Sequence, residues 1–317
     1  MVTLSLVAGL TLLFVGGEAL VRGAVGTARA LDISPLLIGL TVVAMATSAP
    51  ELVVSLGAAF DGKPSIAIGN VVGSNIANIL LILGISALIM PLPCARDLVY
   101  RDGNVMLLAA LALVGFSLFG VIERWHGAVM VAALAMFIGI TFLLERRRRN
   151  GAAKVHEHEA EEVPSPPGGV GVAVILIVAG IAGLVVGAEL LIFGATETAR
   201  GLGVSEAVIG LSLVAVGTSL PELASCAIAA WRGHSDVALG NVIGSNIFNV
   251  LAILGITSST IPLPIDPQFI EVDMWVMLGA SALLLPLMLT GARICRIEGG
   301  LFLAAYAAYI GWLYIGV

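Results

Sequence analysis

The sequence predicts an all-α integral membrane protein with ten transmembrane helices in two inverted-topology repeats of five helices. Three observations carry this prediction: an apolar composition, a series of apolar segments of spanning length, and an internal repeat. Of the 317 residues, 59% are hydrophobic and 11% are charged, against about 25% charged residues in a soluble domain. So few charges cannot cover a water-exposed surface, and we therefore expect the chain to lie in a bilayer.

Ten apolar segments approach or exceed the roughly 20 residues that a helix needs to cross a bilayer. They cover residues 2–22, 35–60, 65–90, 103–122, 126–145, 170–195, 205–231, 236–261, 272–290 and 298–316. Residues 146–169, between the fifth and sixth segments, are charged and rich in Pro and Gly, which is typical of a linker. We divide the chain into a first five-helix repeat (1–145), a polar linker (146–169) and a second, inverted five-helix repeat (170–317).

The repeat is visible when the sequence is shifted by 171 residues. Residues 39–51 then align with 210–222 with 8 of 13 identical, and residues 69–85 align with 240–256 with 13 of 17 identical. Each half contains an odd number of helices, so the second half would enter the membrane in the opposite direction. Inverted repeats of this kind are the architecture of many secondary transporters, which bind their substrate where broken helices of the two halves meet.

The Lys and Arg residues predict the orientation of the chain, because cytoplasmic loops carry an excess of positive charge. With ten helices, twelve of the 15 Lys and Arg residues fall on the side of the linker and three on the other. We therefore expect a multi-pass protein of the cell (inner) membrane, with both termini outside and the 146–169 linker in the cytoplasm.

Each repeat places a glutamate beside a proline in an apolar helix: Pro50-Glu51 in the first and Pro221-Glu222 in the second. An acidic residue at the bilayer centre costs roughly 2.5–3.5 kcal/mol on insertion scales. Proline lacks an N–H, so it breaks the helix and frees the carbonyl four residues earlier. Packing hardly explains a buried acid that recurs at a fixed offset, so we predict that Glu51 and Glu222 are functional.

Hydroxyl and amide side chains accompany the two acids at membrane depth. They are Thr47, Thr218, Ser48, Ser219, Ser74, Ser245, Asn78 and Asn249. The serine and asparagine of the second block are four residues apart and share one helix face. Calcium binds 6–8 oxygen ligands at about 2.3–2.6 Å, whereas transition metals favour His or Cys. The sequence therefore predicts a site for hard metal cations between the two broken helices.

The charge of such a site favours exchange of ions over their free passage. Two carboxylates are neutralised by one calcium ion or by two or three sodium ions. An empty site leaves two like charges in a low dielectric, so its movement across the membrane without a cation is disfavoured. Channels in contrast favour rings of identical subunits.

Other polar and small residues have simpler interpretations. A single Ser or Thr in a membrane helix often only bonds a neighbouring carbonyl or helix. The pairs Gly69/Gly73 and Gly240/Gly244 have the small-xxx-small spacing of close helix packing. We expect Glu18 to pair with Arg22, and Glu189 has no such neighbour in sequence. The three cysteines form no metal or disulfide pattern, and we expect apolar packing for Cys94, Cys226 and Cys295. Five acids are predicted to be solvated in loops: Asp97, Asp102, Asp266, Glu271 and Asp273.

The two motifs, Thr-Ser-x-Pro-Glu and Gly-Asn-x-x-Gly-Ser-Asn, each occur twice. This pattern resembles the two alpha-repeats of the cation/calcium exchanger superfamily, most closely its prokaryotic sodium/calcium exchanger branch. Ala46 stands where that family usually has Gly. The resemblance covers both repeats and implies two inverted five-helix halves that exchange sodium for calcium, with helices one and six sliding to alternate access.

The resemblance also implies roles for individual residues. Glu51 and Glu222 would bind both cations. Backbone carbonyls would come from Thr47 and Thr218, and from Ala44 and Ala215 at two sodium sites. Hydroxyls would come from Ser48, Ser219, Ser74 and Ser245, with Asn78 and Asn249 lining the centre. Some relatives carry an acid at position 249, potassium-dependent ones among them, so an asparagine there indicates a potassium-independent protein.

The sequence thus predicts a sodium/calcium antiporter and no enzyme. It contains no His-Glu-x-x-His motif and no catalytic Ser/Lys, Ser/His or Asp pair. The alternatives are a proton/calcium antiporter of the same fold, since a buried glutamate can carry a proton, and a cation channel. We expect no cofactor, no nucleic acid and no obligate protein partner. Calcium and sodium ions would be the substrates and the lipid bilayer the surrounding medium.

Overall fold

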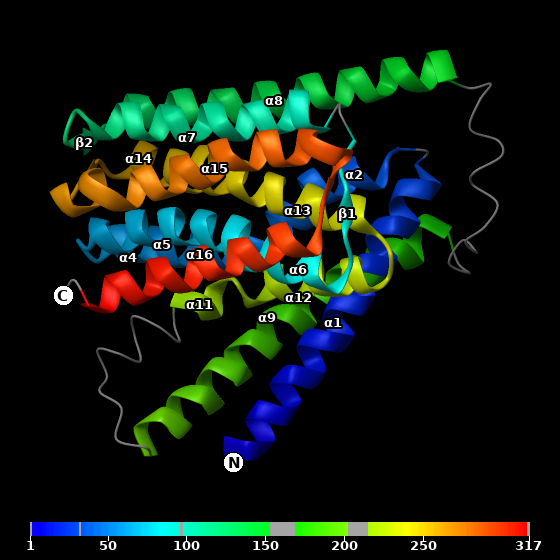
Figure 1. The fold of residues 1–317 in the computed structure, drawn as a ribbon, viewed down its shortest axis with the longest axis horizontal. Coiled ribbons are helices and arrows are strands. Elements are labelled where there is room, and N and C mark those ends of the chain that lie inside the picture. The colour runs from blue at the N-terminus through cyan, green and yellow to red at the C-terminus, as the bar shows by residue number, and fades with distance from the viewer. Residues whose placement is uncertain (1, 32, 96–97, 153–168, 202–214, 316–317) are drawn as a thin grey trace.

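A computed structural model describes residues 2–31, 33–95, 98–152, 169–201 and 215–315 (Figure 1). The first half comprises α1 (Val2–Ala30), α2 (Pro35–Ile38), η1 (Gly39–Val43), α3 (Ala44–Thr47), α4 (Ala49–Phe60), α5 (Pro64–Ala77), η2 (Asn78–Ile82), α6 (Leu83–Ile89), β1 (Leu92–Pro93), η3 (Leu98–Gly103), α7 (Asn104–Ser117), β2 (Val121–Ile122) and α8 (Arg124–Ala152). The second half comprises α9 (Gly169–Gly201), α11 (Ala215–Thr218), α12 (Leu220–Trp231), α13 (Ser235–Phe248), η5 (Asn249–Leu254), α14 (Gly255–Thr260), β3 (Leu263–Pro264), η6 (Phe269–Asp273), α15 (Met274–Leu289), η7 (Thr290–Ala292), β4 (Arg293–Ile294) and α16 (Arg296–Ile315).

The helices confirm an all-α membrane protein. In the described ranges, seven helices are long and apolar enough to cross a membrane, or eight if the pair α2–α3 and α4 counts as one span bent by 42°. The expectation of ten spans stays a prediction, because residues 205–214 of the seventh apolar segment lie outside the described residues and α16 is not among the seven helices counted. Helix α8 continues to Ala152, so helical structure extends into the predicted linker, of which residues 153–168 are not described.

The broken helices have the geometry that the Pro-Glu motif predicts. The break between α3 and α4 falls at Ser48 (φ −86°, ψ 4°), and the equivalent break between α11 and α12 falls at Ser219 (φ −88°, ψ 5°). In both cases the proline is the second residue of the following helix, where no intrahelical N–H is required. The glutamate then lies in the first turn, where the helix dipole favours a carboxylate.

Secondary structure repeats at the same 171-residue offset as the sequence. Helices α4 and α12, helices α5 and α13, and strands β1 and β3 each begin and end 171 residues apart. In the described chain, four glycines have positive φ, which glycine adopts without a Cβ clash, and they form two such pairs. These are Gly62 with Gly233 (71° and 81°) and Gly120 with Gly291 (76° and 82°).

Two short antiparallel ladders join the halves at opposite ends of the molecule (Figure 1). Strand β1 pairs with β4 through Leu92 and Ile294, and β2 pairs with β3 through Ile122 and Leu263. These two-residue strands were not predicted from the sequence. Since β3 is the counterpart of β1 and β4 that of β2, exchanging the halves converts one ladder into the other.

Helices α1 and α9 lie side by side and antiparallel, at an angle to the remaining helices (Figure 1). A Cβ on Gly9 would lie 2.8 Å from the carbonyl oxygen of Gly187, and one on Gly180 would lie 2.8 Å from that of Gly16. Glycine is therefore required for this approach of two backbones. Glycines recur every seven residues on both helices: Gly9, Gly16 and Gly23 on α1, and Gly180, Gly187 and Gly194 on α9.

The core is centred on α13, in which every residue from Val237 to Phe248 is buried. Gly240 and Gly244 allow this, because Cβ atoms there would lie 2.8 Å and 2.5 Å from the carbonyl oxygens of Leu36 and Leu40. The packing interpretation of this glycine pair is confirmed. For the other pair, the described atoms nearest a Cβ on Gly69 belong to the Phe269 ring, and no described atom lies within 4 Å of a Cβ on Gly73, so the packing interpretation of that pair stays a prediction.

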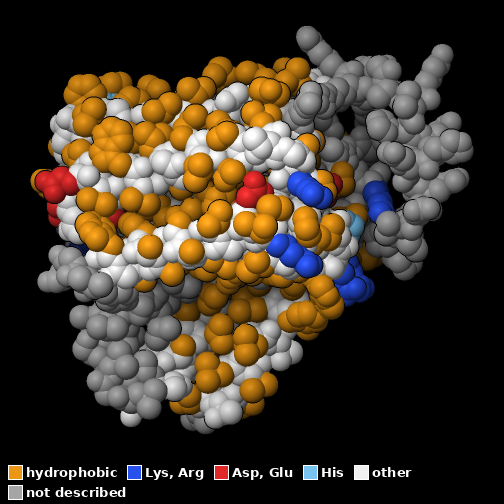
Figure 2. Space-filling model, in the orientation of Figure 1, with side chains coloured by type: hydrophobic (Ala, Val, Ile, Leu, Met, Phe, Trp, Pro, Cys, Tyr) orange, Lys and Arg blue, Asp and Glu red, His pale blue; other side chains and the backbone are white. Residues whose placement is uncertain are grey.

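Charged side chains are unevenly distributed over the visible face (Figure 2). Lys and Arg gather toward the right-hand end in this view, while Asp and Glu lie at the left-hand end and also near the Lys and Arg side chains. The exposed acids Asp266 and Glu271 confirm the expectation of solvated loop residues. Cys94 and Cys226 are buried, in agreement with apolar packing.

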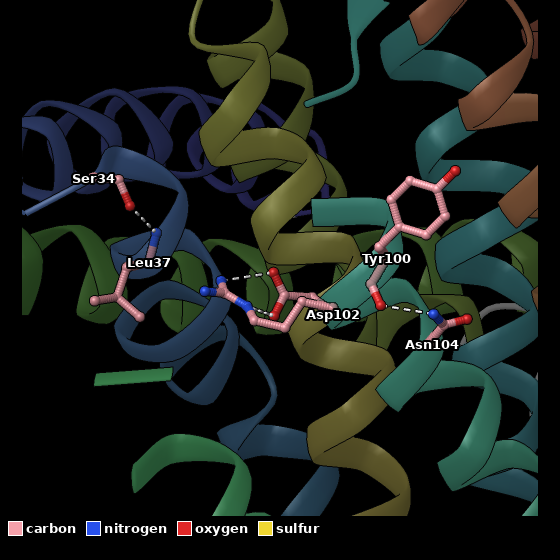
Figure 3. Close-up of polar contacts among 6 residues, drawn as sticks. Ser34, Leu37, Tyr100, Asp102 and Asn104 are labelled. Carbon is pink, nitrogen blue, oxygen red and sulfur yellow. Dashed lines mark hydrogen bonds and ion pairs between the residues drawn. The ribbon is translucent and has the colours of Figure 1, made fainter. Parts of the chain in front are cut away.

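The expectation of solvation is wrong for Asp102 and Asp273, which are 0% and 5% exposed. Both precede a long helix, where the apolar bundle encloses them, and each has a partner that offsets the cost of burial. Asp102 accepts two hydrogen bonds from Arg101, at 2.7 and 2.9 Å (Figure 3). Asp273 accepts one from the Tyr309 hydroxyl at 2.7 Å. Asp97 lies outside the described residues.

Candidate functional site

The two predicted glutamates meet in the interior of the molecule. Glu51 is 1% exposed and Glu222 is 2% exposed. Ser48 Oγ, at the break in the first half, donates to Glu222 Oε1 at 2.9 Å, and its counterpart Ser219 is a hydrogen-bond partner of Glu51. Each broken helix thus presents a serine to the carboxylate of the other, and the two carboxylates interact electrostatically.

Several oxygen atoms in this interior have no hydrogen-bond partner among the described residues. They include one carboxylate oxygen of each acid, Glu51 Oε2 and Glu222 Oε2, and the amide oxygens of Asn78 and Asn249. Burying a polar atom without a partner is unfavourable, and such atoms are rare in native proteins. Four unpartnered oxygens contributed by both halves are therefore well suited to bind cations.

The predicted hydroxyls line the same interior. Ser219 Oγ lies 3.4 Å from Ser74 Oγ, and Ser245 Oγ lies 3.4 Å from Asn241 Oδ1. Thr47 Oγ1 lies 3.1 Å from the Val43 carbonyl and 3.3 Å from Asn241 Oδ1. Helix α13 thereby contacts α3 across the boundary between the halves.

The remaining predicted ligands are described through their backbones. Thr218 ends α11, immediately before the break, as Thr47 ends α3. Ala44 and Ala215 begin the same two short helices. The Ala44 carbonyl accepts a hydrogen bond from the Ser48 N–H at 3.0 Å, so this oxygen already participates in helical bonding.

Asn70 and Asn241 form a layer behind the glutamates that the sequence analysis did not assign to the site. Asn70 Nδ2 donates to the Glu51 carbonyl at 3.2 Å and to Ser55 Oγ at 3.0 Å. Asn241 Nδ2 donates to Ser225 Oγ at 3.0 Å, and Ser225 Oγ donates to the Glu222 carbonyl at 3.0 Å. Recurrence of both asparagines in the Gly-Asn motif was the signal that could have identified them.

A second layer of amides links the halves at their centre. Asn249 Nδ2 donates to Asn75 Oδ1 at 3.0 Å, and Asn75 Nδ2 donates to the Asn246 carbonyl at 3.4 Å. The equivalent atoms of the other pair, Asn78 Nδ2 and Asn246 Oδ1, have no partner in the part of the chain that the structure describes. Asn78 and Asn249 each begin a π-helical turn, which is a common feature of functional sites.

The site is rich in oxygen and poor in softer ligands. Among the described residues, no group of three or more His, Cys, Asp or Glu side chains could hold a metal. The nearby thiol of Cys226 lies 3.1 Å from Asn241 Nδ2, behind the layer of amides. Hydroxyls, amides and carboxylates are ligands for sodium and calcium.

Fold and site together are those of a multi-pass membrane transport protein. The family model described as sodium/calcium exchanger protein matches residues 1–143 and 172–315, and the chain belongs to this family of ion exchangers. It is 39% identical over 310 residues to the putative antiporter CaxA of Alkalimonas amylolytica, covering 97% of each chain. It is 34% identical over 338 residues to the sodium/calcium exchanger MaX1 of Methanosarcina acetivorans, again covering 97% of each.

Solved structures of the sodium-calcium exchanger NCX_Mj share the fold. One, soaked with sodium and calcium, superposes with a TM-score of 0.83 at 34% identity, covering 98% of this chain and 97% of that one. Another, soaked with neither ion, gives 0.83 at 35% identity, covering 99% and 100%. The resemblance inferred from the motifs is therefore confirmed at the level of family and fold.

Proposed function

We propose that this protein is a sodium/calcium antiporter in which both cations bind at Glu51 and Glu222 and cross the membrane by alternating access. The observation that carries the proposal is the unpartnered oxygen on each of two buried carboxylates, one from each half. Two negative charges match one calcium ion or two sodium ions, with a third sodium ion accommodated at a net charge of +1. Competition for the same oxygens would couple the two fluxes.

The two halves, 1–145 and 170–317, are proposed to be inverted five-helix repeats. Support comes from the elements that recur at a 171-residue offset and from ladders that interconvert when the halves are exchanged. Contacts at the site follow the same rule, since Ser48 bonds Glu222 and Ser219 bonds Glu51. A binding site at the interface of inverted repeats has equivalent surroundings in the outward-open and inward-open states.

Individual ligands are proposed from their positions around the carboxylates. Bidentate glutamates supply four oxygens, and the carbonyls of Thr47 and Thr218 bring the number to six, the lower end of the calcium range. Hydroxyls at the breaks and on the facing helices would complete the sodium sites, together with the carbonyls of Ala44 and Ala215. These hydroxyls belong to Ser48, Ser219, Ser74 and Ser245. The amide oxygens of Asn78 and Asn249 would line the centre.

We propose that both termini face outward and that the linker lies in the cytoplasm of a cell (inner) membrane. Exposed Arg232, Arg293 and Arg296 support this, because they lie where helices end or begin on the predicted linker side. In Figure 2 the Lys and Arg side chains gather at one end, while acidic side chains lie both at the other end and near them. A surplus of positive charge on the cytoplasmic side is the general rule.

The direct test is calcium-45 uptake by proteoliposomes loaded with sodium, compared with proteoliposomes loaded with potassium or carrying an acid-inside proton gradient. We expect uptake only when sodium is inside. Uptake driven by protons alone would replace sodium by protons as the coupling ion, and uptake without a counter-ion would indicate a channel. Either of these results would overturn the proposal.

A further inference from the structure

Helix α1 is held against the C-terminal end of α12 by an ion pair that the site does not use. Glu18 of α1 accepts hydrogen bonds from Arg232 Nε and Nη2, each at 2.8 Å, in a two-point contact. Such two-point contacts between a guanidinium and a carboxylate are among the stronger hydrogen bonds of proteins. Glu18 also pairs with Arg22 within α1, as the sequence predicted, but only Arg232 connects the two helices.

Aromatic and apolar contacts complete this connection. The Arg232 guanidinium lies 4.8 Å from the centroid of the Trp231 ring, and that ring lies 5.8 Å from the ring of Phe14 on α1. A Cβ on Gly17 would lie 2.5 Å from Ile228 Cδ1, so α1 lies directly on α12. We call the set Phe14, Gly17, Glu18, Ile228, Trp231 and Arg232 the α1–α12 clasp.

The equivalent contact is absent from the other half of the described structure. The counterpart of α12 is α4, where Val53 is 70% and Phe60 is 67% exposed and no described atom lies within 4 Å of a Cβ on Gly57. The counterpart of Glu18 is Glu189, an exposed residue with no ion pair among the described residues. The counterpart of Arg232 is Asp61, which has the charge of Glu189 and cannot pair with it.

We propose that the α1–α12 clasp is a one-sided latch, which stabilises the conformation with α1 on α12 relative to the conformation in which α9 would lie on α4. This inference rests on the proposed alternating access, which requires both arrangements. In the second arrangement the 171-residue symmetry brings Glu189 toward Asp61, so like charges replace the ion pair. The sequence thus favours the access state with α1 on α12 through residues that bind no ion. Glu18 and Arg232 act as positioning residues for α1.

The latch can be tested without transport, by the distance between spin labels on α1 and on α16. Leu10→Cys and Leu301→Cys provide labelling sites, since these leucines are 58% and 64% exposed. Cys295→Ser removes the partly exposed native thiol. Cys94 and Cys226 are buried, and burial raises the pKa of the Cys94 thiol to about 12, so both remain unreactive. Distances are measured in proteoliposomes with sodium or calcium on both sides.

We expect Arg232→Gln to lower the ratio of the α1-on-α12 population to the other population by about two- to tenfold. Arg22→Gln is the matched control and should leave the ratio near that of the parent, because it removes only the pair within α1. Asp61→Arg gives Glu189 a partner in the second arrangement and should also lower the ratio. The charge exchange Glu18→Arg with Arg232→Glu should restore it.

An unchanged distance distribution in Arg232→Gln would overturn the latch, whether the parent shows one population or two. If that variant does not fold, an Asp61→Arg distribution identical to the parent's would overturn it equally. Sodium-dependent calcium-45 uptake by the parent in the same proteoliposomes tests the proposed function separately. If the parent transports calcium but Arg232→Gln leaves the spin-label distances unchanged, the latch is contradicted and the proposed function is not.

Discussion

The two halves of the molecule agree at the centre and differ at the periphery. Around the glutamates each element has a counterpart 171 residues away, down to the backbone angles at Ser48 and Ser219. At the periphery, α1 covers Ile228 of α12, which is 6% exposed, whereas no described atom lies within 4 Å of a Cβ on Gly57, its counterpart on α4. We infer from this comparison that the proposed binding chemistry is shared equally by the halves, while the proposed choice between two conformations depends on residues that they do not share.

A second asymmetry lies within the site. Asn249 donates to Asn75, but the corresponding atoms of Asn78 and Asn246 find no partner within the described ranges. Behind them, Asn70 faces the hydroxyl of Ser55, whereas Asn241 faces the thiol of Cys226 at the equivalent position. Substitutions at matched positions of the two halves can therefore separate the shared chemistry from the asymmetry.

The largest effect is expected at the glutamates. We predict that Glu51→Gln and Glu222→Gln each abolish sodium-dependent calcium uptake, a loss of at least about 100-fold. Each variant replaces a charged carboxylate, which would stabilise the bound cation by several kcal/mol, with a neutral amide. Both variants should remain folded, since an amide is less costly to bury than a charge. Calcium-45 flux and size-exclusion chromatography measure the two results. Normal transport by either variant would contradict equal participation of the halves.

The glycine contact of α1 and α9 should show the next largest effect. Gly180→Leu inserts a side chain where a Cβ alone would lie 2.5 Å from the Leu20 backbone nitrogen, and overpacking of this kind typically costs about 1–3 kcal/mol. We expect a lower thermal unfolding midpoint in detergent and slower transport. Gly171→Leu on the same helix is the control, since no described atom lies within 4 Å of a Cβ there. Equal effects of both variants would show that the contact is dispensable.

A smaller, more specific change is expected from Asn249→Asp. A third buried acid adds a group that can bind a proton as the pH falls, so calcium uptake should become more strongly pH-dependent or change its sodium dependence. Asn78→Asp is the matched variant in the other half. Neither Oδ1 nor Nδ2 of Asn78 has a hydrogen-bond partner among the described residues. Flux measured between pH 6 and pH 8 distinguishes them. If Asn249→Asp transports like the parent at every pH and sodium concentration, Asn249 does not belong to the site.

The smallest effect is expected from Cys226→Ser, which makes the second half resemble the first at the position of Ser55. Asn241 Nδ2, which already donates to Ser225 Oγ, then has an oxygen in place of the sulfur as its second acceptor, so transport should change by less than about twofold. Calcium-45 flux checks this against the inverse variant Ser55→Cys. A large loss in Cys226→Ser would assign the thiol a role beyond filling space.

Much of the fold and of the site centre could be predicted from sequence because duplication marks the residues concerned. Burying even one acid beside a proline in an apolar helix is costly. Its recurrence at Glu51 and Glu222 therefore identified the pair that the structure brings together. The breaks at Ser48 and Ser219 followed from the chemistry of proline alone.

What sequence could not show depends on contacts between distant segments. Asp102 and Asp273 lie in short connections that hydropathy marks as loops, and their burial follows from the packing of α7 and α15. Glu18 had a plausible partner in Arg22 four residues away, which concealed the contact with Arg232. The role of Asn241 required the position of Thr47, which lies in the other half.

The central claim is that sodium and calcium share one site built from a glutamate of each half. Equilibrium binding of calcium-45 to the purified protein, titrated with sodium, tests it most directly. The account predicts calcium binding that sodium displaces, and no measurable binding to either Glu51→Gln or Glu222→Gln at the same calcium concentration. Binding that persists in both variants, or that sodium does not displace, would contradict it.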